Sequence, residues 1–183
     1  MFARWVVQDW LYLQTYLEVL TALARRAPTD EARSRWHALL ALTRDEELEL
    51  HRRFAARFGL SSDDLAEATP WPATVAYTRF LRETATTDYA MGVAALLPCG
   101  QGYVELARAL SRGAPPEDPR YVDWIRMYAD PSFDEAVVWM EEELLGMGLS
   151  LEALRPALVA GAKHELAFWD QLWRGEGPSP GAT

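Results

Sequence analysis

Cys99 is the first of three residues in this chain whose type and surroundings could support chemistry. It lies in the segment Leu97-Pro98-Cys99-Gly100, inside a stretch that is otherwise typical of a helix. A proline inside a helix removes a backbone hydrogen bond and costs about 3 kcal/mol. The sequence therefore predicts a helix break at the thiol. If Cys99 begins the second half-helix, backbone N–H dipoles would lower the thiol pKa. Alternatively, Cys99 is a small, inert, buried residue at a kink.

Glu165 is the second candidate, because it interrupts an apolar and aromatic stripe. Leu158, Ala162, Glu165, Trp169 and Trp173 follow one another at helical spacing and share one face. Burial of the carboxyl group on that face would raise its pKa toward the range that suits proton transfer. Alternatively, Glu165 lies at the edge of the stripe and reaches water.

Asp9 is the third candidate, because it shares a helical face with aromatic residues. Trp5, Asp9, Tyr12 and Tyr16 lie on this face. A buried carboxylate without a partner costs several kcal/mol, so Asp9 needs one. The partner is a ligand amine or amidine, a tyrosine hydroxyl, or an arginine within the protein.

Signals for metal sites and for other catalytic classes are weak. Glu47 and His51 are four residues apart, and His164 precedes Glu165. Three histidines without a repeated Glu-x-x-His motif argue against a carboxylate-bridged metal pair. No phosphate-binding glycine loop and no Ser-His-Asp hydrolase signature is present. Four further tyrosines are each more typical of a core than of a site: Tyr77, Tyr103, Tyr121 and Tyr128.

Helical periodicity, with no strand pattern and no repeat, predicts an all-α protein that folds as a helical bundle. We expect helices over 4–26, 31–58, 73–86, 88–111, 121–129, 133–145 and 150–173. Thr29 or Asp30 is expected to cap the second helix, and Gly59 to end it. We predict one domain over residues 1–174 and a disordered Gly/Pro-rich tail over 175–183.

The composition excludes several classes of function. Of the 183 residues, 18 are Lys or Arg and 27 are Asp or Glu, so the formal net charge is −9. This charge argues against a nucleic-acid partner and against binding to an anionic membrane. No apolar run approaches the ~20 residues of a membrane span, and the N-terminus does not resemble a signal peptide. With a single cysteine, we expect a cytoplasmic protein without disulfides.

Six short motifs, in order along most of the chain, resemble those of the TenA family, also called thiaminase II, within the haem-oxygenase-like helical superfamily. The motifs are Trp5-x-x-Gln8-Asp9-x-x-Tyr12-Leu13, Glu47-x-x-x-His51, Ala76-Tyr77-Thr78-x-Phe80-Leu81, Leu97-Pro98-Cys99-x-x-x-Tyr103-x-Glu105, Tyr121-x-x-Trp124-Ile125-x-x-Tyr128 and Glu165-x-x-Phe168-Trp169. The resemblance implies an up-and-down bundle of seven or eight helices around a pyrimidine pocket.

The resemblance also implies an activity, which is the hydrolysis of 4-amino-5-aminomethyl-2-methylpyrimidine to the hydroxymethyl compound in thiamin salvage. Thiamin itself can be cleaved by the same chemistry. By the same resemblance, Cys99 is the nucleophile that adds to the ring, Glu165 the acid/base that helps to expel the amine, and Asp9 the group that binds the pyrimidine. The walls of the pocket would be Tyr12, Tyr77, Tyr103 and Tyr128. No metal or organic cofactor is implied, and the family's members are commonly homotetramers or homodimers.

Two features depart from the family pattern. Family members usually carry a further N-terminal helix before the Gln-Asp motif, which here begins at Gln8. An aromatic residue, often tryptophan, usually lies two residues after the cysteine, where this chain has Gln101. We therefore expect an altered pocket floor. Three alternatives stay open: a shifted substrate, a non-catalytic ligand-binding or regulatory relative, and a metal-dependent oxidase, against which the scarcity of histidines counts.

Overall fold

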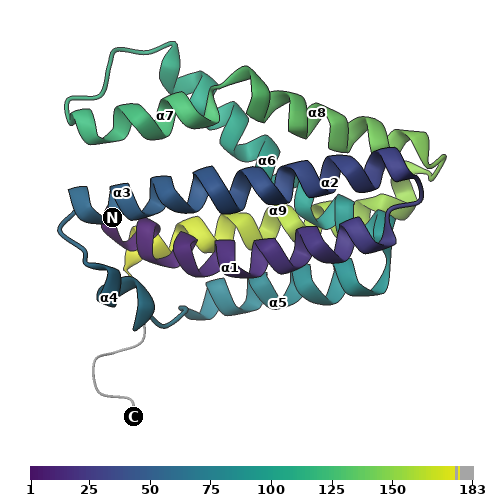
Figure 1. The fold of residues 1–183 in the computed structure, drawn as a ribbon, viewed down its shortest axis with the longest axis horizontal. Coiled ribbons are helices and arrows are strands. Elements are labelled where there is room, and N and C mark those ends of the chain that lie inside the picture. Colours follow the sequence, from purple (N-terminus) through teal and green to yellow (C-terminus); the bar gives the residue numbers. More distant parts are fainter. Residues whose placement is uncertain (176, 178–183) are drawn as a thin grey trace.

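The computed structural model describes residues 1–175 and 177, and these residues form helices and connecting segments without a strand (Figure 1). The elements in chain order are α1 (Phe2–Arg26), α2 (Asp30–Leu42), η1 (Thr43–Glu47), α3 (Leu48–Arg57), α4 (Ser62–Ala66), α5 (Pro72–Thr87), α6 (Tyr89–Ser111), η2 (Pro119–Tyr121), α7 (Val122–Tyr128), α8 (Pro131–Gly146) and α9 (Leu151–Arg174). The prediction of an all-α bundle is confirmed. The predicted disordered tail falls largely on residues outside the described part of the chain.

The long helices lie roughly side by side and enclose one apolar core (Figure 1). Helix α1 packs against α2 and α5, and α6 packs against α5, α8 and α9. The expected helix ends are present where local chemistry dictates them. The Thr29 hydroxyl accepts a hydrogen bond from the Ala32 amide, and Gly59 has a φ of 77° after the end of α3. Positive φ favours glycine because it has no Cβ.

The predicted helix over 31–58 is wrong in one respect, because a π-helical turn divides it. In η1 the Leu48 amide donates to the Thr43 carbonyl, five residues back. A π turn accommodates one extra residue and rotates the side chains that follow it relative to a regular α-helix. Glu47 ends this turn, and its carboxyl group reaches the interior. Such turns occur frequently at functional sites.

The helix break that the sequence predicted at Cys99 is also wrong. Helix α6 continues through Pro98 and Cys99 from Tyr89 to Ser111. Its first half is almost entirely buried, including Val93 and Leu96. Burial of this apolar face outweighs the cost of one proline within the helix, because most helix stability in proteins comes from tertiary packing.

Gly161 allows α9 to lie directly against α6 at this proline. A Cβ atom added at Gly161 would overlap the Ala95 carbonyl group and lie 3.3 Å from Pro98 Cγ. The backbones of the two helices are therefore in contact one turn before Cys99. This contact fixes the position of the thiol relative to α9.

We expect Gly161→Ala to lower the free energy of unfolding by about 1–3 kcal/mol, because the added methyl group forces the two helices apart. Urea denaturation measures this change. The matched control is Gly102→Ala, where an added Cβ meets no atom within 4 Å. The control should be neutral or should stabilise the helix by up to ~1 kcal/mol. Equal stability of Gly161→Ala and the wild-type protein would show that the contact does not constrain the helices.

No helix in the described part of the chain is long and apolar enough to cross a membrane.

Candidate active site

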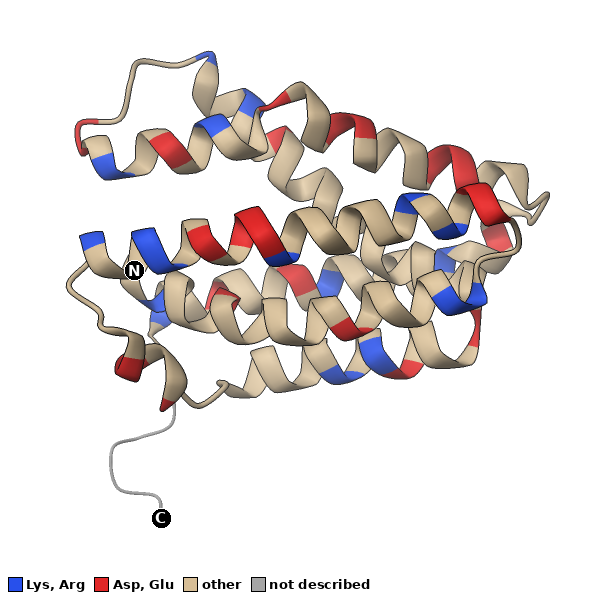
Figure 2. Cartoon of the chain, viewed as in Figure 1, with Lys and Arg blue, Asp and Glu red and all other residues tan. Residues whose placement is uncertain are grey.

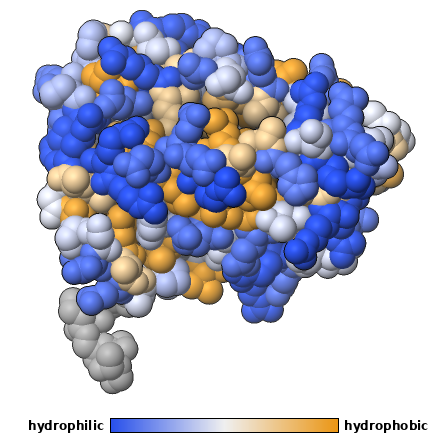
Figure 3. All heavy atoms as spheres, viewed as in Figure 1, coloured by the Kyte–Doolittle hydropathy of each residue, from blue (hydrophilic) through white to orange (hydrophobic). Residues whose placement is uncertain are grey.

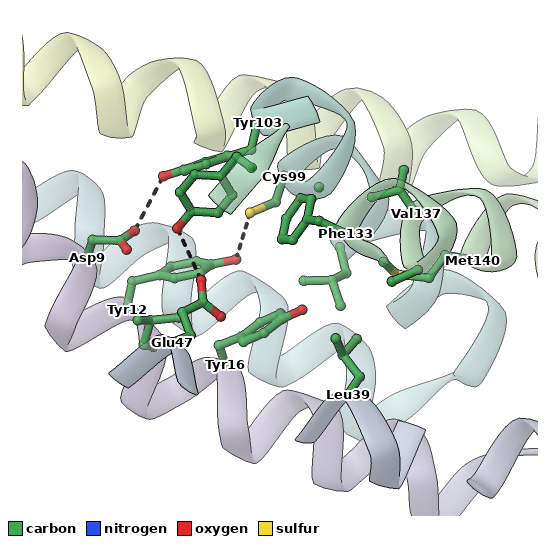
Figure 4. Close-up of a pocket in the computed structure, with 15 residues that line it drawn as sticks. Asp9, Tyr12, Tyr16, Leu39, Glu47, Cys99, Tyr103, Phe133, Val137 and Met140 are labelled. Atoms are coloured by element: carbon green, nitrogen blue, oxygen red, sulfur yellow. Dashed lines mark hydrogen bonds between the residues drawn. The ribbon is translucent and has the colours of Figure 1, made fainter. Parts of the chain in front are cut away.

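A narrow cavity lies between α1, the α2–η1 segment, α6 and α8 (Figure 4). The unoccupied volume at this site is about 530 Å³, including the open solvent at its entrance. The cavity itself is a slot with little room between its walls, which are mainly aromatic and aliphatic. Its lining residues with polar side chains are Asp9, Tyr12, Tyr16, Glu47, Cys99, Tyr103 and Tyr128. A slot of this shape fits a flat aromatic ring.

Cys99 projects from the middle of α6 into this cavity (Figure 4). The Tyr12 hydroxyl donates a hydrogen bond to its Sγ atom over 3.4 Å. Burial, followed by the negative charge of Glu165, raises the pKa of the Cys99 thiol well above its usual value, although the hydrogen bond from Tyr12 lowers it. Of the two alternatives from the sequence, the one in which a helix N-terminus lowers the thiol pKa does not hold, because Cys99 lies within a continuous helix.

Asp9 has a partner that the sequence analysis did not identify, namely His51. The His51 Nε2 atom lies 2.6 Å from Asp9 Oδ2, and its Nδ1 atom lies 2.9 Å from the Glu47 carbonyl oxygen. A carbonyl and a carboxylate only accept hydrogen bonds, so both ring nitrogens must donate. His51 and Asp9 therefore form a buried ion pair. Burial lowers the pKa of His51, but the hydrogen bond and charge of Asp9 raise it above its usual value.

The second oxygen of Asp9 faces the cavity and is weakly engaged. The Tyr103 hydroxyl lies 3.4 Å from Asp9 Oδ1 and accepts a hydrogen bond from Trp5 Nε1 over 3.1 Å. The ion pair and the tyrosine thus hold the Asp9 carboxylate in one orientation. A ligand N–H group can donate to Asp9 Oδ1 in place of the Tyr103 hydroxyl.

Glu165 approaches Cys99 from α9. Trp169 Nε1 donates to Glu165 Oε1 over 2.8 Å. Burial raises the pKa of Glu165 to about 7, against the opposing effect of its hydrogen bonds. This agrees with the prediction that burial places its pKa in the range for proton transfer. Glu165 itself lines a neighbouring hollow between α6 and α9, together with Pro98 and Tyr103.

Glu47 is a second carboxyl group with a raised pKa. It lines the cavity from η1. The Tyr128 hydroxyl donates to Glu47 Oε1 over 3.1 Å. Burial raises the pKa of Glu47 to about 7, although the positive charge of His51 lowers it. The described residues contain no group of three or more His, Cys, Asp or Glu side chains arranged to hold a metal ion.

A comparison with family models identifies the relationships of this chain. The model for the TENA/THI-4/PQQC family matches residues 1–175. The chain belongs to this family.

Several relatives of this TenA-type chain agree with the assignment. An aminopyrimidine aminohydrolase of Halalkalibacterium halodurans is 30% identical over 180 residues, which are 94% of this chain and 80% of the relative. The thiamine biosynthesis multifunctional protein ThiED of Corynebacterium glutamicum is 34% identical over 180 residues, which are only 22% of that longer protein. A TenA homologue from P. horikoshii OT3 superimposes with a TM-score of 0.85 at 26% identity, over 95% of this chain and 83% of that one.

The structure brings together most of the residues that the TenA resemblance singles out. The cavity is lined by Asp9, Tyr12, Cys99, Tyr103 and Tyr128. Tyr77 does not line it but lies behind Tyr12, with ring centroids 5.2 Å apart and a hydroxyl group that is buried without a hydrogen bond of normal geometry. Tyr77 is therefore a supporting residue in this structure rather than a wall.

Gln101 does not form the floor of the cavity, contrary to the expectation from the sequence. Its amide is hydrogen-bonded to Glu141 on α8, outside the cavity lining. The neighbouring Gly100 lines the cavity instead, and a Cβ there would lie 2.8 Å from Val137 Cγ2. The absence of a side chain at residue 100 lets α8 approach α6 and narrows the slot at this point.

Sequence reasoning noted Glu47 and His51 only as a weak metal signal and within a family motif. It noted Tyr16 only as a member of the Asp9 face, and it missed Phe133 as a lining residue. Glu47 and His51 could have been linked by their spacing of four residues, which places both side chains on one helical face. Their actual partners, Tyr128 and Asp9, lie 81 and 42 residues away in the sequence. No local pattern could have identified these partners.

We expect the ligand-free protein to lose stability as the pH rises from about 5 to about 8. The raised pKa values of Glu47 and Glu165 mean that the folded state holds more protons than the unfolded state above pH 4.5. His51 acts in the same direction, because its pKa is higher in the folded state than in the unfolded state. Its contribution to the stability of the folded state is complete below the unfolded-state pKa of 6.5 and disappears as the pH rises above the folded-state pKa.

The expected loss is roughly 1–3 kcal/mol for each carboxyl group. Urea denaturation at pH 5.5 and 8.5 measures it, and Glu47→Gln should remove part of the difference. Equal or greater stability at pH 8.5 would contradict the assigned pKa values.

Proposed function

We propose that this chain hydrolyses the C–N bond of 4-amino-5-aminomethyl-2-methylpyrimidine, releasing ammonia and the hydroxymethylpyrimidine, with Cys99 as nucleophile and Glu165 as acid/base. One observation carries the proposal. The Cys99 thiol lies in an aromatic slot, close enough to Glu165 for that carboxyl group to affect the thiol pKa, and burial raises the pKa of Glu165 itself to about 7. The name of the Halalkalibacterium halodurans relative supports the reaction class.

The geometry suits binding of the pyrimidine in the slot. The Tyr12 and Tyr103 rings offer apolar faces to the substrate ring. Asp9 Oδ1, which has only a 3.4 Å contact to Tyr103, accepts a hydrogen bond from the ring amino group. The contact with His51 holds the Asp9 carboxylate in this orientation.

The reaction then proceeds through a covalent adduct. The Cys99 sulfur adds to an electron-poor ring carbon, while Glu165 takes the thiol proton and delivers a proton to a ring nitrogen. The ring electrons return to expel the amine, as ammonia, from the adjacent methylene group. Water adds its hydroxyl to that methylene group and gives its other proton to the ammonia. The ring loses its added proton to Glu165, the carbon–sulfur bond breaks, and the Cys99 thiolate regains its proton from Glu165. The net change is the exchange of an amine for a hydroxyl group at one carbon.

The high pKa of the free thiol is consistent with this sequence of events. A buried thiolate beside Glu165, Asp9 and Glu47 is unfavourable in the empty cavity. A bound substrate that carries positive charge reduces this repulsion. We therefore expect the thiol to become reactive only when the substrate is bound.

Hydrolysis by the wild-type protein and by Cys99→Ala, with thiamin as a parallel substrate, tests the proposal. Turnover that requires Cys99 supports it. Binding of the aminopyrimidine without conversion by the folded wild-type protein would overturn it in favour of a non-catalytic ligand-binding relative. Absence of binding and turnover would indicate a different small-molecule substrate.

A further inference from the structure

Glu47 lies where the cavity opens to the surface. A second hollow adjoins the cavity and shares four of its lining residues: Tyr16, Leu39, Glu47 and Phe133. We call this hollow the mouth. Its remaining lining residues are Leu42, Thr43, Glu46, Met127, Asp130 and Ser132. The mouth lies where η1 faces the junction of α7 and α8, and Figure 3 shows apolar side chains in the middle of that face, surrounded by hydrophilic ones.

The linings of the cavity and the mouth are acidic and include no cationic side chain. Neither lining includes a lysine or an arginine. His51 lies behind the cavity, and its charge is already paired with Asp9. Glu46 and Asp130 add two carboxyl groups at the rim. Figure 2 shows acidic residues along both segments that flank the mouth, α2–α3 and α8.

Glu47 thus has hydrogen-bond donors but no cation of its own. Tyr128 donates to one carboxyl oxygen, and the Thr43 side chain also stabilises the charged form. The other groups that act on it are His51 from α3, Asp9 and Tyr16 from α1, and Cys99 from α6. A buried carboxyl group in such surroundings is stable either with a proton or with a positively charged ligand.

We propose that Glu47 is the residue that selects for a positively charged leaving group, either the ammonium of an aminomethyl substituent or the cationic azolium ring of thiamin. This inference rests on the proposed function. Asp9, Cys99 and Glu165 account for the pyrimidine ring, and none of them lines the mouth. The substituent that leaves must pass from the cavity to the surface, and Glu47 is the carboxyl group common to the cavity and the mouth.

The arrangement explains how one site can hold the substrate and release the product. A cationic substituent beside Glu47 forms a charge-assisted hydrogen bond, which is roughly twice as strong as a neutral one. The hydroxymethyl product has the same ring but no charge, so it lacks this interaction. The leaving group takes the bonding electron pair and departs as neutral ammonia or neutral thiazole, so it too loses its charge interaction with Glu47 and can leave through the mouth.

The decisive variant is Glu47→Gln, which keeps the shape and the acceptor for Tyr128 but removes the charge. We expect the dissociation constant or KM for the aminomethylpyrimidine to rise ~10–100-fold, with the same direction for thiamin. The dissociation constant of the neutral hydroxymethyl product should change less than ~3-fold. Glu49→Gln is the matched control, because Glu49 is exposed on the same segment and pairs with Arg52. The control should match the wild-type protein with all ligands.

A second measurement uses the unaltered protein and so does not depend on folding of the variant. A bound cation lowers the pKa of a neighbouring carboxyl group, so binding of the aminomethylpyrimidine at pH 7 should release protons. Calorimetry in buffers of different ionisation enthalpy detects this release. The neutral product should release fewer protons.

The outcomes separate this inference from the proposed function. Turnover by the wild-type protein, with equal loss of affinity for charged and neutral ligands in Glu47→Gln, would overturn only the role of Glu47. Binding of the aminomethylpyrimidine to the wild-type protein without release of protons would likewise overturn only the role of Glu47. A wild-type protein that neither binds nor converts the aminopyrimidine would overturn both.

Discussion

Cys99→Ala is expected to abolish hydrolysis of the aminopyrimidine, with kcat at least ~10⁴-fold below that of the wild-type protein. The substitution removes the sulfur that forms the covalent bond to the ring, and no other cysteine exists in the chain. The hydroxyl group of Tyr12 loses its acceptor, but the aromatic walls of the slot remain. Steady-state kinetics with ammonia detection measures the effect.

Binding of the hydroxymethyl product provides the control for this variant. Its dissociation constant should stay within a few-fold of the wild-type value, because the proposed site binds the ring through Asp9 and the tyrosines rather than through the sulfur. Residual turnover within 10-fold of wild type would rule out Cys99 as nucleophile. An unchanged rate with weakened product binding would assign Cys99 to the wall of the slot alone.

The pKa of the thiol adds a second readout. Since burial and Glu165 raise it well above the usual value, alkylation of Cys99 in the ligand-free protein should be slow at pH 7. Rapid alkylation at this pH would contradict the raised pKa. It would favour an activated thiol of the kind that the sequence first indicated.

Glu165→Gln is expected to lower kcat by ~10²–10⁴-fold and to leave the affinity for the pyrimidine nearly unchanged. Glutamine can still accept the hydrogen bond from Trp169 Nε1, so the side chain stays in place. It cannot deliver or accept a proton at neutral pH. The large effect should therefore appear in the rate and not in binding.

The pH profile distinguishes proton transfer from a structural role. Because burial raises the pKa of Glu165 to about 7, the wild-type rate should change around this pH, and that inflection should be absent in Glu165→Gln. Glu152→Gln is the control, since Glu152 is exposed on the same helix. A large loss of binding with an unchanged rate would remove Glu165 from the proton-transfer step.

The sequence by itself determined the helical architecture and the candidates for chemistry. Apolar periodicity identified the long helices, and capping chemistry fixed ends such as those at Thr29 and Gly59. The same periodicity placed Glu165 on an apolar and aromatic face, although it left open whether the carboxyl group is buried or reaches water. These properties depend on residues within a few positions of one another, which is why a local pattern predicts them.

Only the tertiary structure decided what surrounds each candidate. The continuity of α6 through Pro98 depends on its packing against α9, so the helix break that the sequence predicted is wrong. Of the two alternatives for Cys99, a lowered thiol pKa or a buried thiol, the structure has the buried one. The pairing of Asp9 with His51 and the outward position of Gln101 depend on contacts between helices. The spacing of residues defines which face of a helix is apolar, but it does not define which side chains of other helices meet that face. These contacts between helices determine the burial and the neighbouring charges of Cys99, Glu47 and Glu165, and thereby their pKa values.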